Sequence, residues 1–419
     1  MPNDKLHVIH PLVVVGAGPV GLTAALAARH HQLPVLIVEA EPEDRTRPGS
    51  RATYLFQETL DLLESVADGV TAPITEQANN WESLRTTYSG RQIYFKRFPP
   101  CRPGKFGAAI SQRESEQVLL KRCHEEGVQF RWKTSVTGVH TTSDRVTLTL
   151  DDGSRLHASY VIAADGARSA VRRALGIELD GDRSESSFVI VDVAEDPAAP
   201  LERTRSFHYR SPAVDGRNVL MVPFAGGWRI DLECRPDEDV RPWQEEPLLS
   251  QWVAAVAGPK YASRISWVST YRFHRSVALS YTDDHARVLL TGEAAHLFPP
   301  FGGGRGLNSG VPDAIFGVEA IAKALSDPAS RARSSMRSRQ NAALRVSPTV
   351  TPHLRHWCTW RPAAASCVCS SDSLPFSPGG SADPVNGSIA RPWGRAGQSP
   401  PVPGSEAESS RAQTDEELQ

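Results

Sequence analysis

Three glycines near the start of the chain, Gly16, Gly18 and Gly21, have the spacing of a dinucleotide-binding loop. In the pattern G-x-G-x-x-G the first glycine makes a tight turn, the second lets the backbone approach a pyrophosphate, and the third lets a helix pack on a strand. The helix that follows offers free N–H groups and the positive end of its dipole to the phosphates. Glu39 lies where an acid that bonds an adenosine ribose hydroxyl is expected. These residues predict a dinucleotide site, and the motif alone leaves FAD and NAD open.

The elements on either side of the glycines favour this interpretation over a glycine-rich turn without a ligand. Residues 12–15 form a β-branched run typical of a buried parallel strand, residues 22–29 an alanine-rich helix, and residues 35–39 a second buried strand. Together they make one βαβ unit of a doubly wound sheet. Because the motif stands at the N-terminus and later motifs also suit a flavin, FAD is favoured as the resident dinucleotide.

A second segment, residues 160–172, runs from a buried strand into Asp165-Gly166 and the start of a helix. An acid at the carboxyl end of a parallel strand lies where open α/β sheets bind their ligands. An Asx turn or a helix N-cap is the alternative interpretation of Asp165.

A third segment, residues 287–310, again places an acid, Glu293, after a buried strand. Two prolines, several glycines and a helix that begins near Leu307 and Asn308 follow. A loop with several turns would explain the glycines, but not the acid, the prolines and the helix together. If the ligand is a flavin, the N-terminus of this helix would stabilise negative charge on the N1–C2=O side of the reduced ring.

These three motifs, in this order and spacing, resemble those of the class A flavoprotein monooxygenases, the para-hydroxybenzoate hydroxylase-like family, over about residues 8–325. The resemblance implies that the first motif binds the ADP part of FAD, the second lies near the pyrophosphate and also serves NAD(P)H, and the third holds the ribityl chain. The FAD-contacting residues that it implies are Gly16, Gly18, Gly21, Glu39, Arg51, Gln112, Asp165, Gly166, Gly292, Glu293, Pro299, Gly306, Leu307 and Asn308. The chain departs from the family at Glu293, where an aspartate is usual, and by an extra glycine within residues 302–304.

The activity that the resemblance implies is a monooxygenation. NADH or NADPH would reduce FAD, and a C4a-hydroperoxyflavin formed with dioxygen would hydroxylate a small, phenol-like aromatic compound. No side-chain nucleophile is needed, and no catalytic residue is assigned. The candidate substrate contacts are Val222, Phe224, Trp228, Pro300 and Phe301.

Three further side chains have two interpretations each. Arg229 or His208 would suit a phenolate or a carboxylate, and packing in the core is the alternative for these and for the substrate candidates. His296, beside the third motif, is either functional or satisfied by a hydrogen bond to the backbone.

Two other functions remain open at this point. One is an epoxidase or another oxidoreductase of the same fold. The other is a non-catalytic FAD-binding remnant with an impaired C-terminus, because helical patterning fades near Leu344. A halogenase is not favoured, since no W-x-W-x-I-P run is present, and a disulfide reductase lacks a C-x₄-C pair beside the first helix.

The predicted fold class is α/β, with two domains and a tail. A Rossmann-like FAD-binding domain with a parallel sheet is expected from residues 8–180 and 286–345. An inserted, mostly antiparallel β domain at residues 181–285 would bind the substrate. Residues 346–419 are rich in proline and serine without apolar periodicity, so they are expected to be a disordered, low-complexity tail.

The composition fits this assignment. The 419 residues are 40% hydrophobic and 22% charged, with a net charge of −2, which does not suit nucleic-acid binding. The six cysteines are scattered, and Cys367 and Cys369 alone are a weak metal signal, so reduced cytoplasmic thiols and no metal site are expected. Residues 11–28 are nearly uncharged, but a buried strand and helix explain them better than a membrane span. The expected partners are the aromatic substrate and dioxygen, and a homodimer is one expected assembly.

Overall fold

The first of two large sheets contains the predicted βαβ unit. In the computed structural model its order is β5-β2-β1-β8-β7-β6, with β14 beside β8. Strand β1 pairs in parallel with both β2 and β8, and the β7–β8 hairpin turns at residues 151–153 as predicted. The strands are β1 (Ile9–Val15), β2 (Val35–Val38), β5 (Gln129–Arg131), β6 (Val136–Thr141), β7 (Val146–Leu150), β8 (Arg155–Ala163) and β14 (Val288–Leu290).

Helices cover one face of this sheet. Alternate residues of each strand point to opposite sides of the sheet, so its buried residues fall into two clusters. Leu12 and Val14 of β1 pack with the helices in one buried cluster, whereas Val13 and Val15 belong to a second cluster on the other face. The helices on that face are α1 (Pro19–His30), α2 (Gln57–Val66), α3 (Thr71–Gln77), α4 (Gln112–Glu125) and α9 (Arg305–Ser326). The short helix α5 (Ala170–Ala174) contributes Val171 to the cluster on the other face. Ser111 caps α4 in a reciprocal capping box with Glu114.

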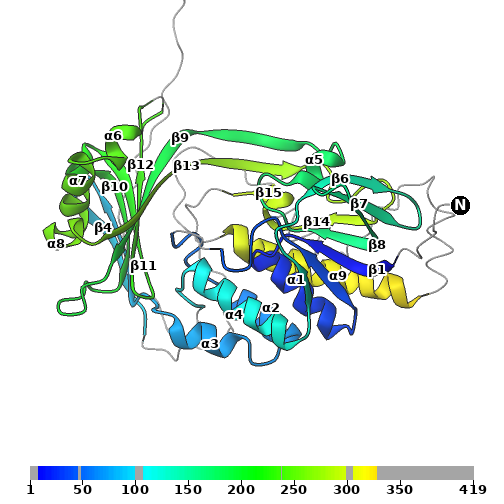
Figure 1. The fold of residues 1–419 in the computed structure, drawn as a ribbon. Coiled ribbons are helices and arrows are strands. Elements are labelled where there is room, and N and C mark those ends of the chain that lie inside the picture. The colour runs from blue at the N-terminus through cyan, green and yellow to red at the C-terminus, as the bar shows by residue number, and fades with distance from the viewer. Residues whose placement is uncertain (1–7, 46–48, 100–106, 237, 299–304, 328–419) are drawn as a thin grey trace, which may run out of the picture. The chain divides into compact units, whose positions relative to one another are not determined.

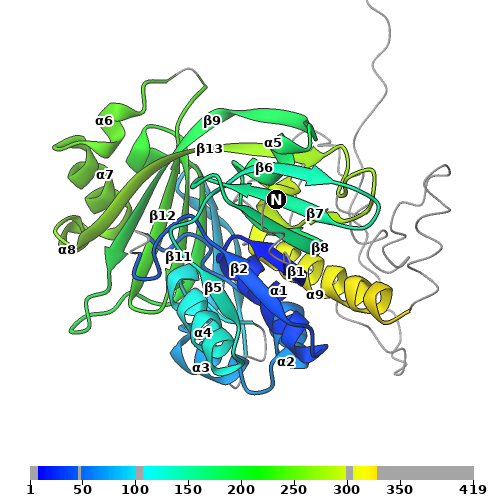
Figure 2. The ribbon, with the colours of Figure 1, turned by 45° about the vertical axis from the view of Figure 1, so that its right-hand side comes forward.

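The second sheet is mostly antiparallel, in the order β15-β13-β9-β12-β11-β10-β3-β4. Helices α6, α7 and α8 lie on its outer face, and β9 and β13 run side by side from this sheet toward α5 (Figures 1 and 2). Its strands are β3 (Ser83–Tyr88), β4 (Arg91–Arg97), β9 (Leu179–Ala194), β10 (Thr204–Ser211), β11 (Arg217–Phe224), β12 (Gly227–Glu233), β13 (Ile265–Ala278) and β15 (His296–Leu297). Its helices are η1 (Pro212–Val214), α6 (Arg241–Gln244), α7 (Leu248–Ala257) and α8 (Pro259–Ala262), and η2 (Gly292–Ala294) precedes β15.

The predicted α/β fold with an added antiparallel sheet is confirmed, but the predicted boundary between its two parts differs from the structure. Strands β3 and β4 come from residues 83–97, inside the segment predicted for the dinucleotide part, yet β3 pairs in parallel with β10 of the second sheet. Strand β13 was not predicted, and it pairs with β9 over its whole length. Both differences come from pairing between residues far apart in the chain, which local patterns do not reveal.

The structure describes residues 8–45, 49–99, 107–236, 238–298 and 305–327. The predicted tail at 346–419 and the candidates Pro299, Pro300 and Phe301 therefore lie outside the described residues. Within the described part of the chain, no helix is both long and apolar enough to cross a membrane.

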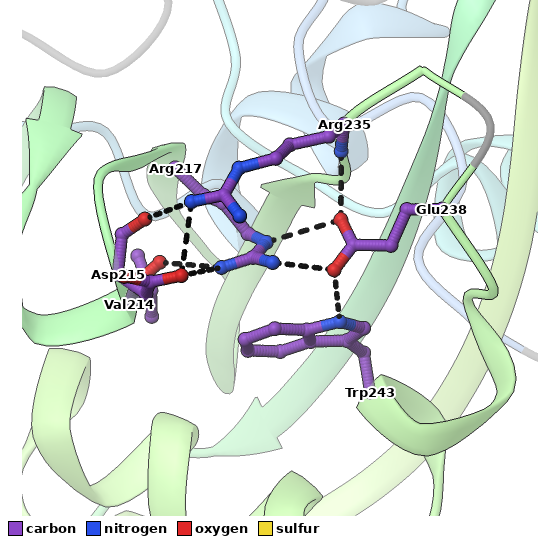
Figure 3. Close-up of polar contacts among 6 residues, drawn as sticks. All are labelled: Val214, Asp215, Arg217, Arg235, Glu238 and Trp243. Carbon is purple, nitrogen blue, oxygen red and sulfur yellow. Dashed lines mark hydrogen bonds and ion pairs between the residues drawn. The ribbon is translucent and has the colours of Figure 1, made fainter.

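The outer side of the second sheet is held by a buried arginine. Arg217 is stacked 4.1 Å from the ring of Trp243 and donates hydrogen bonds to Glu238 and Asp215 (Figure 3). Trp243 donates its indole N–H to the same carboxylate of Glu238, at 2.9 Å. The Arg217 side chain is only 5% exposed, so its charge depends on these partners.

Replacing Glu238 by glutamine is therefore expected to lower the free energy of unfolding by about 2 kcal/mol, because a buried guanidinium loses its charged partner. Urea denaturation measures this change. Asp239→Asn is the matched control: Asp239 pairs with Arg241 where both side chains are exposed, so its loss should leave the free energy of unfolding almost unchanged. Equal effects of the two substitutions would contradict a special role for Arg217.

Candidate active site

A cleft of about 990 Å³ lies where the carboxyl ends of the parallel strands meet the inner face of the second sheet. We call its two regions the loop end and the sheet end. The loop end includes Gly16, Gly18, Glu39, Arg51, Gln112, Asp165, Gly166, Arg168, Glu293, Gly306 and Leu307. The sheet end includes Tyr54, Trp81, Ile190, Arg205, Leu220, Val222, Arg229, Asp231, Trp267, Ser269 and Tyr271. Residues of all three sequence motifs thus meet at one cavity.

The glycine loop is built on a backbone conformation that favours glycine. Gly16 has φ +103°, and a Cβ added there would lie only 2.8 Å from the carbonyl carbon of Ala164. A Cβ on Gly21 would lie 3.0 Å from the carbonyl carbon of Gly16, so Gly21 faces the loop and does not line the cleft. Helix α1 starts at Gly18 with no side-chain cap and no acid in its first turn. The loop therefore presents an uncapped helix N-terminus to the cleft, as an anion site requires.

Glu39 joins the end of β2 to the glycine loop. Its Oε2 accepts a hydrogen bond from the backbone N–H of Ala17 at 2.6 Å, and Oε1 accepts one from Glu41 at 2.9 Å. The residue is 7% exposed and still lines the cleft. A carboxylate oxygen can accept more than one hydrogen bond, so both oxygens keep capacity for a ligand hydroxyl.

Asp165 lines the cleft and is also hydrogen-bonded to the helix that follows it. Its Oδ2 accepts a hydrogen bond from the backbone N–H of Val171 at 3.1 Å, at the start of α5. Its Oδ1 is buried and has no hydrogen-bond partner among the described residues. Buried polar atoms are nearly always paired, so this oxygen indicates a ligand or water at the cleft. The N-cap of α5 is Ser169.

A buried arginine that the sequence did not single out, Arg172, connects the second and third motifs. It donates hydrogen bonds to the backbone carbonyls of Ala294 at 3.0 Å and Ala167 at 3.1 Å. The strand-to-helix turns on either side of the cleft are thus fixed to each other. Arg172 lies one turn into a helix with a second arginine beside it, a pattern that could not be distinguished from a solvated helix face.

The third motif forms a short turn, η2, that places Glu293 in the cleft. The Glu293 side chain is exposed to the cleft, but many protein atoms surround its carboxyl, and the desolvation that they cause raises the pKa of that carboxyl. His296 and Arg51 nearby oppose that rise. Glu293 Oε1 also lies 3.8 Å from where a Cβ on Gly306 would stand, so it reaches the start of α9.

His296 is paired with a side chain through one ring nitrogen, while its buried Nδ1 has no hydrogen-bond partner among the described residues. Its Nε2 lies 2.7 Å from Oδ2 of Asp313 on α9, and both residues are buried. The same carboxylate oxygen accepts a hydrogen bond from the backbone N–H of Gly292 at 3.1 Å. Asp313 therefore links α9 to η2 and β15, and His296 does not line the cleft.

The segment that contains Arg51 is attached to the second sheet. Asp192 of β9 accepts hydrogen bonds from the backbone N–H and the hydroxyl of Ser50, at 2.6 and 2.8 Å. Burial raises the pKa of the Asp192 carboxyl, and these bonds oppose the rise. Arg229 of β12 donates to the carbonyl of Arg51, and Gln112 donates its backbone N–H to Ser50. The two predicted residues Arg51 and Gln112 thus line the cleft, and the Arg51 segment is held by the second sheet and by the start of α4.

Asn308 does not line the cleft, although a contact with the flavin ring was predicted. Its Oδ1 accepts hydrogen bonds from the backbone N–H of Phe56 at 2.8 Å and from the Thr59 hydroxyl at 2.7 Å. Its Nδ2 donates to the carbonyl of Tyr54 at 2.9 Å. The N-cap residue of α2, Phe56, offers no side-chain cap, so Asn308 supplies that cap from a distant helix.

We expect Asn308→Ala to lower the free energy of unfolding by about 2 kcal/mol, because three hydrogen-bonding groups, one buried and two half-buried, lose their partner. Its FAD affinity should change less than about threefold. Asn218→Ala, which removes a cross-strand amide away from the cleft, is the control and should cost about 1 kcal/mol. Chemical denaturation and flavin fluorescence titration measure the two quantities. If Asn308→Ala instead strongly weakens FAD binding and leaves the free energy of unfolding unchanged, the predicted contact between Asn308 and the flavin would be supported.

Three of the predicted substrate contacts lie in the described part of the chain, and one of them lines the sheet end. Val222 lines the cleft, but Phe224 does not. Trp228 is 2% exposed and donates its indole N–H to Glu195 at 2.6 Å on the outer side of the sheet. The physical reason is the period of two along a strand: Arg229 and Asp231 face the cleft, so their neighbour Trp228 faces away.

The two charged candidates also have protein partners. Arg229 is paired with Asp231 at 2.7 Å as well as with the carbonyl of Arg51. His208 lies 3.0 Å from the Thr87 hydroxyl and does not line the cleft. The aromatic residues Tyr54, Trp81, Trp267 and Tyr271 were missed. The alternation of β13 is the signal that could have found Trp267 and Tyr271, whereas Tyr54 and Trp81 lie outside the strands.

Comparison with known proteins agrees with this geometry. A model of the family described as FAD binding domain matches residues 10–345. Rifampicin monooxygenase of Streptomyces venezuelae is 30% identical over 325 residues, which are 73% of this chain. The chain belongs to this family of class A flavoprotein monooxygenases. A 3-(3-hydroxy-phenyl)propionate/3-hydroxycinnamic acid hydroxylase of Mycolicibacterium smegmatis is 28% identical over 73% of the chain.

Solved structures show the same fold. p-Nitrophenol 4-monooxygenase from Pseudomonas putida superposes with a TM-score of 0.66 at 25% identity, over 85% of this chain and 91% of that one. Aklavinone-11 hydroxylase with FAD and aklavinone gives a TM-score of 0.63 at 24% identity, over 76% and 63% of the two chains. The flavoprotein chain spans 62% of the rifampicin enzyme and 53% of the mycobacterial hydroxylase.

FAD is the family's cofactor, and the residues present fit it. The uncapped start of α1 suits the pyrophosphate, Glu39 suits a ribose hydroxyl, and the orphaned Oδ1 of Asp165 faces the same cavity. Glu293 offers a carboxylate acceptor to a polyhydroxylated chain, and the start of α9 offers a positive dipole end beside it. Donors and acceptors are thus distributed along one cavity of about 990 Å³ that residues of all three motifs line.

Proposed function

We propose that this flavoprotein hydroxylates a phenol-like aromatic compound, with NADH or NADPH and dioxygen as co-substrates. The observation that supports this best is the continuity of one cleft from the glycine loop to a face lined with aromatic side chains. Bound FAD would accept a hydride from NAD(P)H and activate dioxygen, so that one oxygen atom enters the ring and the other leaves as water. The relatives whose names record hydroxylation or monooxygenation agree with this reaction class.

The side chains of the chain position the ligands and exclude water. Val222, Leu220 and Ile190 form the apolar floor of the sheet end, against which an aromatic ring can pack. Trp267 lies against Gly49, where a Cβ would stand only 2.5 Å from the ring, so the ring closes the space between the second sheet and the Arg51 segment. A closed, apolar surround protects reactive intermediates from water.

The test is the oxidation of NADH and NADPH by the purified, FAD-loaded protein with a panel of phenols, together with the mass of the product. We expect at least one phenol to accelerate NAD(P)H consumption and to gain one oxygen atom. Epoxide formation from an alkene would instead favour the epoxidase. A flavin-loaded protein that no aromatic compound accelerates would favour the non-catalytic remnant, and a protein that takes up no FAD would overturn the proposal.

A further inference from the structure

A row of three side chains crosses neighbouring strands of the second sheet. Asp192 of β9 stands opposite Arg229 of β12 on one side and opposite Trp267 of β13 on the other. The side chains of residues directly opposite each other in antiparallel strands point to the same face of a sheet. Arg229 and Trp267 line the cleft, so this cross-strand row lies on the cleft side.

A β-bulge places Trp267 in the cross-strand row. Ile265 pairs with Val193 and Trp267 pairs with Asp192, so Ser266 is the extra residue between them. In a regular strand Ser266 would stand opposite Asp192, and the Trp267 side chain would point to the other face of the sheet. Bulges next to binding sites redirect a side chain in this way. The bulge therefore turns Trp267 toward the cleft.

The cross-strand row holds residues 49–51, with one contact from each strand. Trp267 lies against the first of these residues. Asp192 accepts hydrogen bonds from the backbone N–H and the hydroxyl of the second, at 2.6 and 2.8 Å. Arg229 donates a hydrogen bond to the backbone carbonyl of the third. Asp192 makes the central contact, and it is only 3% exposed.

Arg51, at one end of the row, has a left-handed backbone conformation, with φ +53°. Few residues other than glycine adopt this conformation, and where it persists the surrounding structure enforces it. Desolvation raises the pKa of the Glu293 carboxyl and of the Tyr271 hydroxyl, and the positive charge of Arg51 opposes both rises. The Arg51 guanidinium therefore acts on both the loop end and the sheet end of the cleft.

We propose that Asp192 is a positioning residue for the flavin site: by holding Ser50 it keeps Arg51 in this conformation and so sets the affinity for FAD. An arginine held in place binds an anionic part of a ligand with less loss of side-chain entropy. The inference rests on the proposed function in one respect, that Arg51 contacts the cofactor. The sequence did not single out Asp192, because its place between Arg229 and Trp267 follows from strand pairing.

The experiment is a double-mutant cycle on FAD affinity, measured by fluorescence titration of the full-length, ligand-free protein. Asp192→Ala removes both hydrogen bonds to Ser50. Arg51→Met removes the charge and keeps a long side chain, and the double substitution shows whether Asp192 acts through Arg51. Asp192→Asn is the conservative variant, because its oxygen can accept from the Ser50 N–H while its amide donates to the Ser50 hydroxyl.

Glu195→Ala is the matched control. Glu195 also accepts two hydrogen bonds on the second sheet, from the indole N–H of Trp228 at 2.6 Å and from the hydroxyl of Tyr261, but it does not line the cleft. Glu195→Ala should lower the urea midpoint of unfolding, as Asp192→Ala does, and leave FAD affinity unchanged.

We expect Asp192→Ala and Arg51→Met each to weaken FAD binding about tenfold. In the presence of Arg51→Met, Asp192→Ala should weaken it by less than twofold further, because the side chain through which it acts is gone. Asp192→Asn should stay within about threefold of the unsubstituted protein. If Asp192→Ala does not fold, Ser50→Ala, which removes one of the two bonds, takes its place in the cycle with an expected weakening of about threefold.

Equal weakening by Asp192→Ala with and without Arg51→Met would overturn the proposal, as would equal weakening by Glu195→Ala, because loss of stability would then explain the effect. Unchanged FAD affinity in Arg51→Met would also overturn it. Since FAD binding requires no turnover, the expected cycle in a protein that hydroxylates no aromatic compound would support the role of Asp192 and contradict the proposed function. Hydroxylation together with additive effects in the cycle would do the reverse.

Discussion

Gly16→Ala is expected to weaken FAD binding at least 100-fold, which is about 2.7 kcal/mol. Gly16 has φ +103°, where an alanine is strained, and its new Cβ would stand 2.8 Å from the carbonyl carbon of Ala164. That carbonyl belongs to the residue directly after β8, so either the glycine loop or the Asp165 turn must move. Both line the loop end of the cleft. Flavin content after purification and fluorescence titration of the ligand-free protein measure the effect.

The control for this substitution is Gly153→Ala in the β7–β8 hairpin. Gly153 also has positive φ, at +78°, but a Cβ there would meet no atom within 4 Å. Backbone strain alone should cost about 1 kcal/mol of stability and leave FAD affinity unchanged. The difference between the two variants isolates the close approach at Gly16. Wild-type flavin affinity in Gly16→Ala would show that the tight contact with Ala164 is not needed for the site.

The sequence predicted those parts of the site that depend on local pattern. A β-branched run followed by glycines and an alanine-rich helix defines β1, its turn and α1 within about 20 residues, because strand, turn and helix signals are all local. The acids Glu39, Asp165 and Glu293 were found for the same reason: each follows a buried strand, and the ends of parallel strands meet.

Residues whose role depends on distant partners could not be predicted in this way. In the sequence, Asn308 lies at the start of a helix beside a predicted ligand. Its hydrogen bonds to Tyr54, Phe56 and Thr59, which only the structure shows, make it a cap of α2 instead. The prediction for Trp228 is wrong by one position along the strand, and one position moves a side chain from one face of a sheet to the other. The place of Asp192 in the cross-strand row follows from the pairing of β9 with β12 and β13.

Glu293→Gln is expected to have opposite effects on the ligand-free and the FAD-bound protein. Burial raises the pKa of the Glu293 carboxyl in the folded state above its value in the unfolded chain. The ionised carboxylate therefore destabilises the ligand-free fold at pH values above the raised pKa. This penalty fades as the pH falls through that pKa, since protonation is then favoured in the folded state. Glutamine carries no charge, so the variant should unfold at higher urea concentration at alkaline pH and approach the unsubstituted protein in acid.

FAD binding should change in the other direction. A carboxylate accepts hydrogen bonds from ligand hydroxyls more strongly than an amide does, so Glu293→Gln should bind FAD about tenfold more weakly, or about 1.4 kcal/mol. Glu293→Asp is the matched control because it keeps the charge and restores the acid usual in the family. The free energy of unfolding of the ligand-free Glu293→Asp variant should still fall as the pH rises through the raised pKa. Its FAD affinity should stay within about threefold of that of the unsubstituted protein. If Glu293→Gln instead destabilises the ligand-free protein at every pH, then Arg51, His296 and the Ala167 amide already compensate the carboxylate. In that case the longer side chain stabilises the fold, and FAD affinity should be the same with glutamate, glutamine or aspartate at position 293.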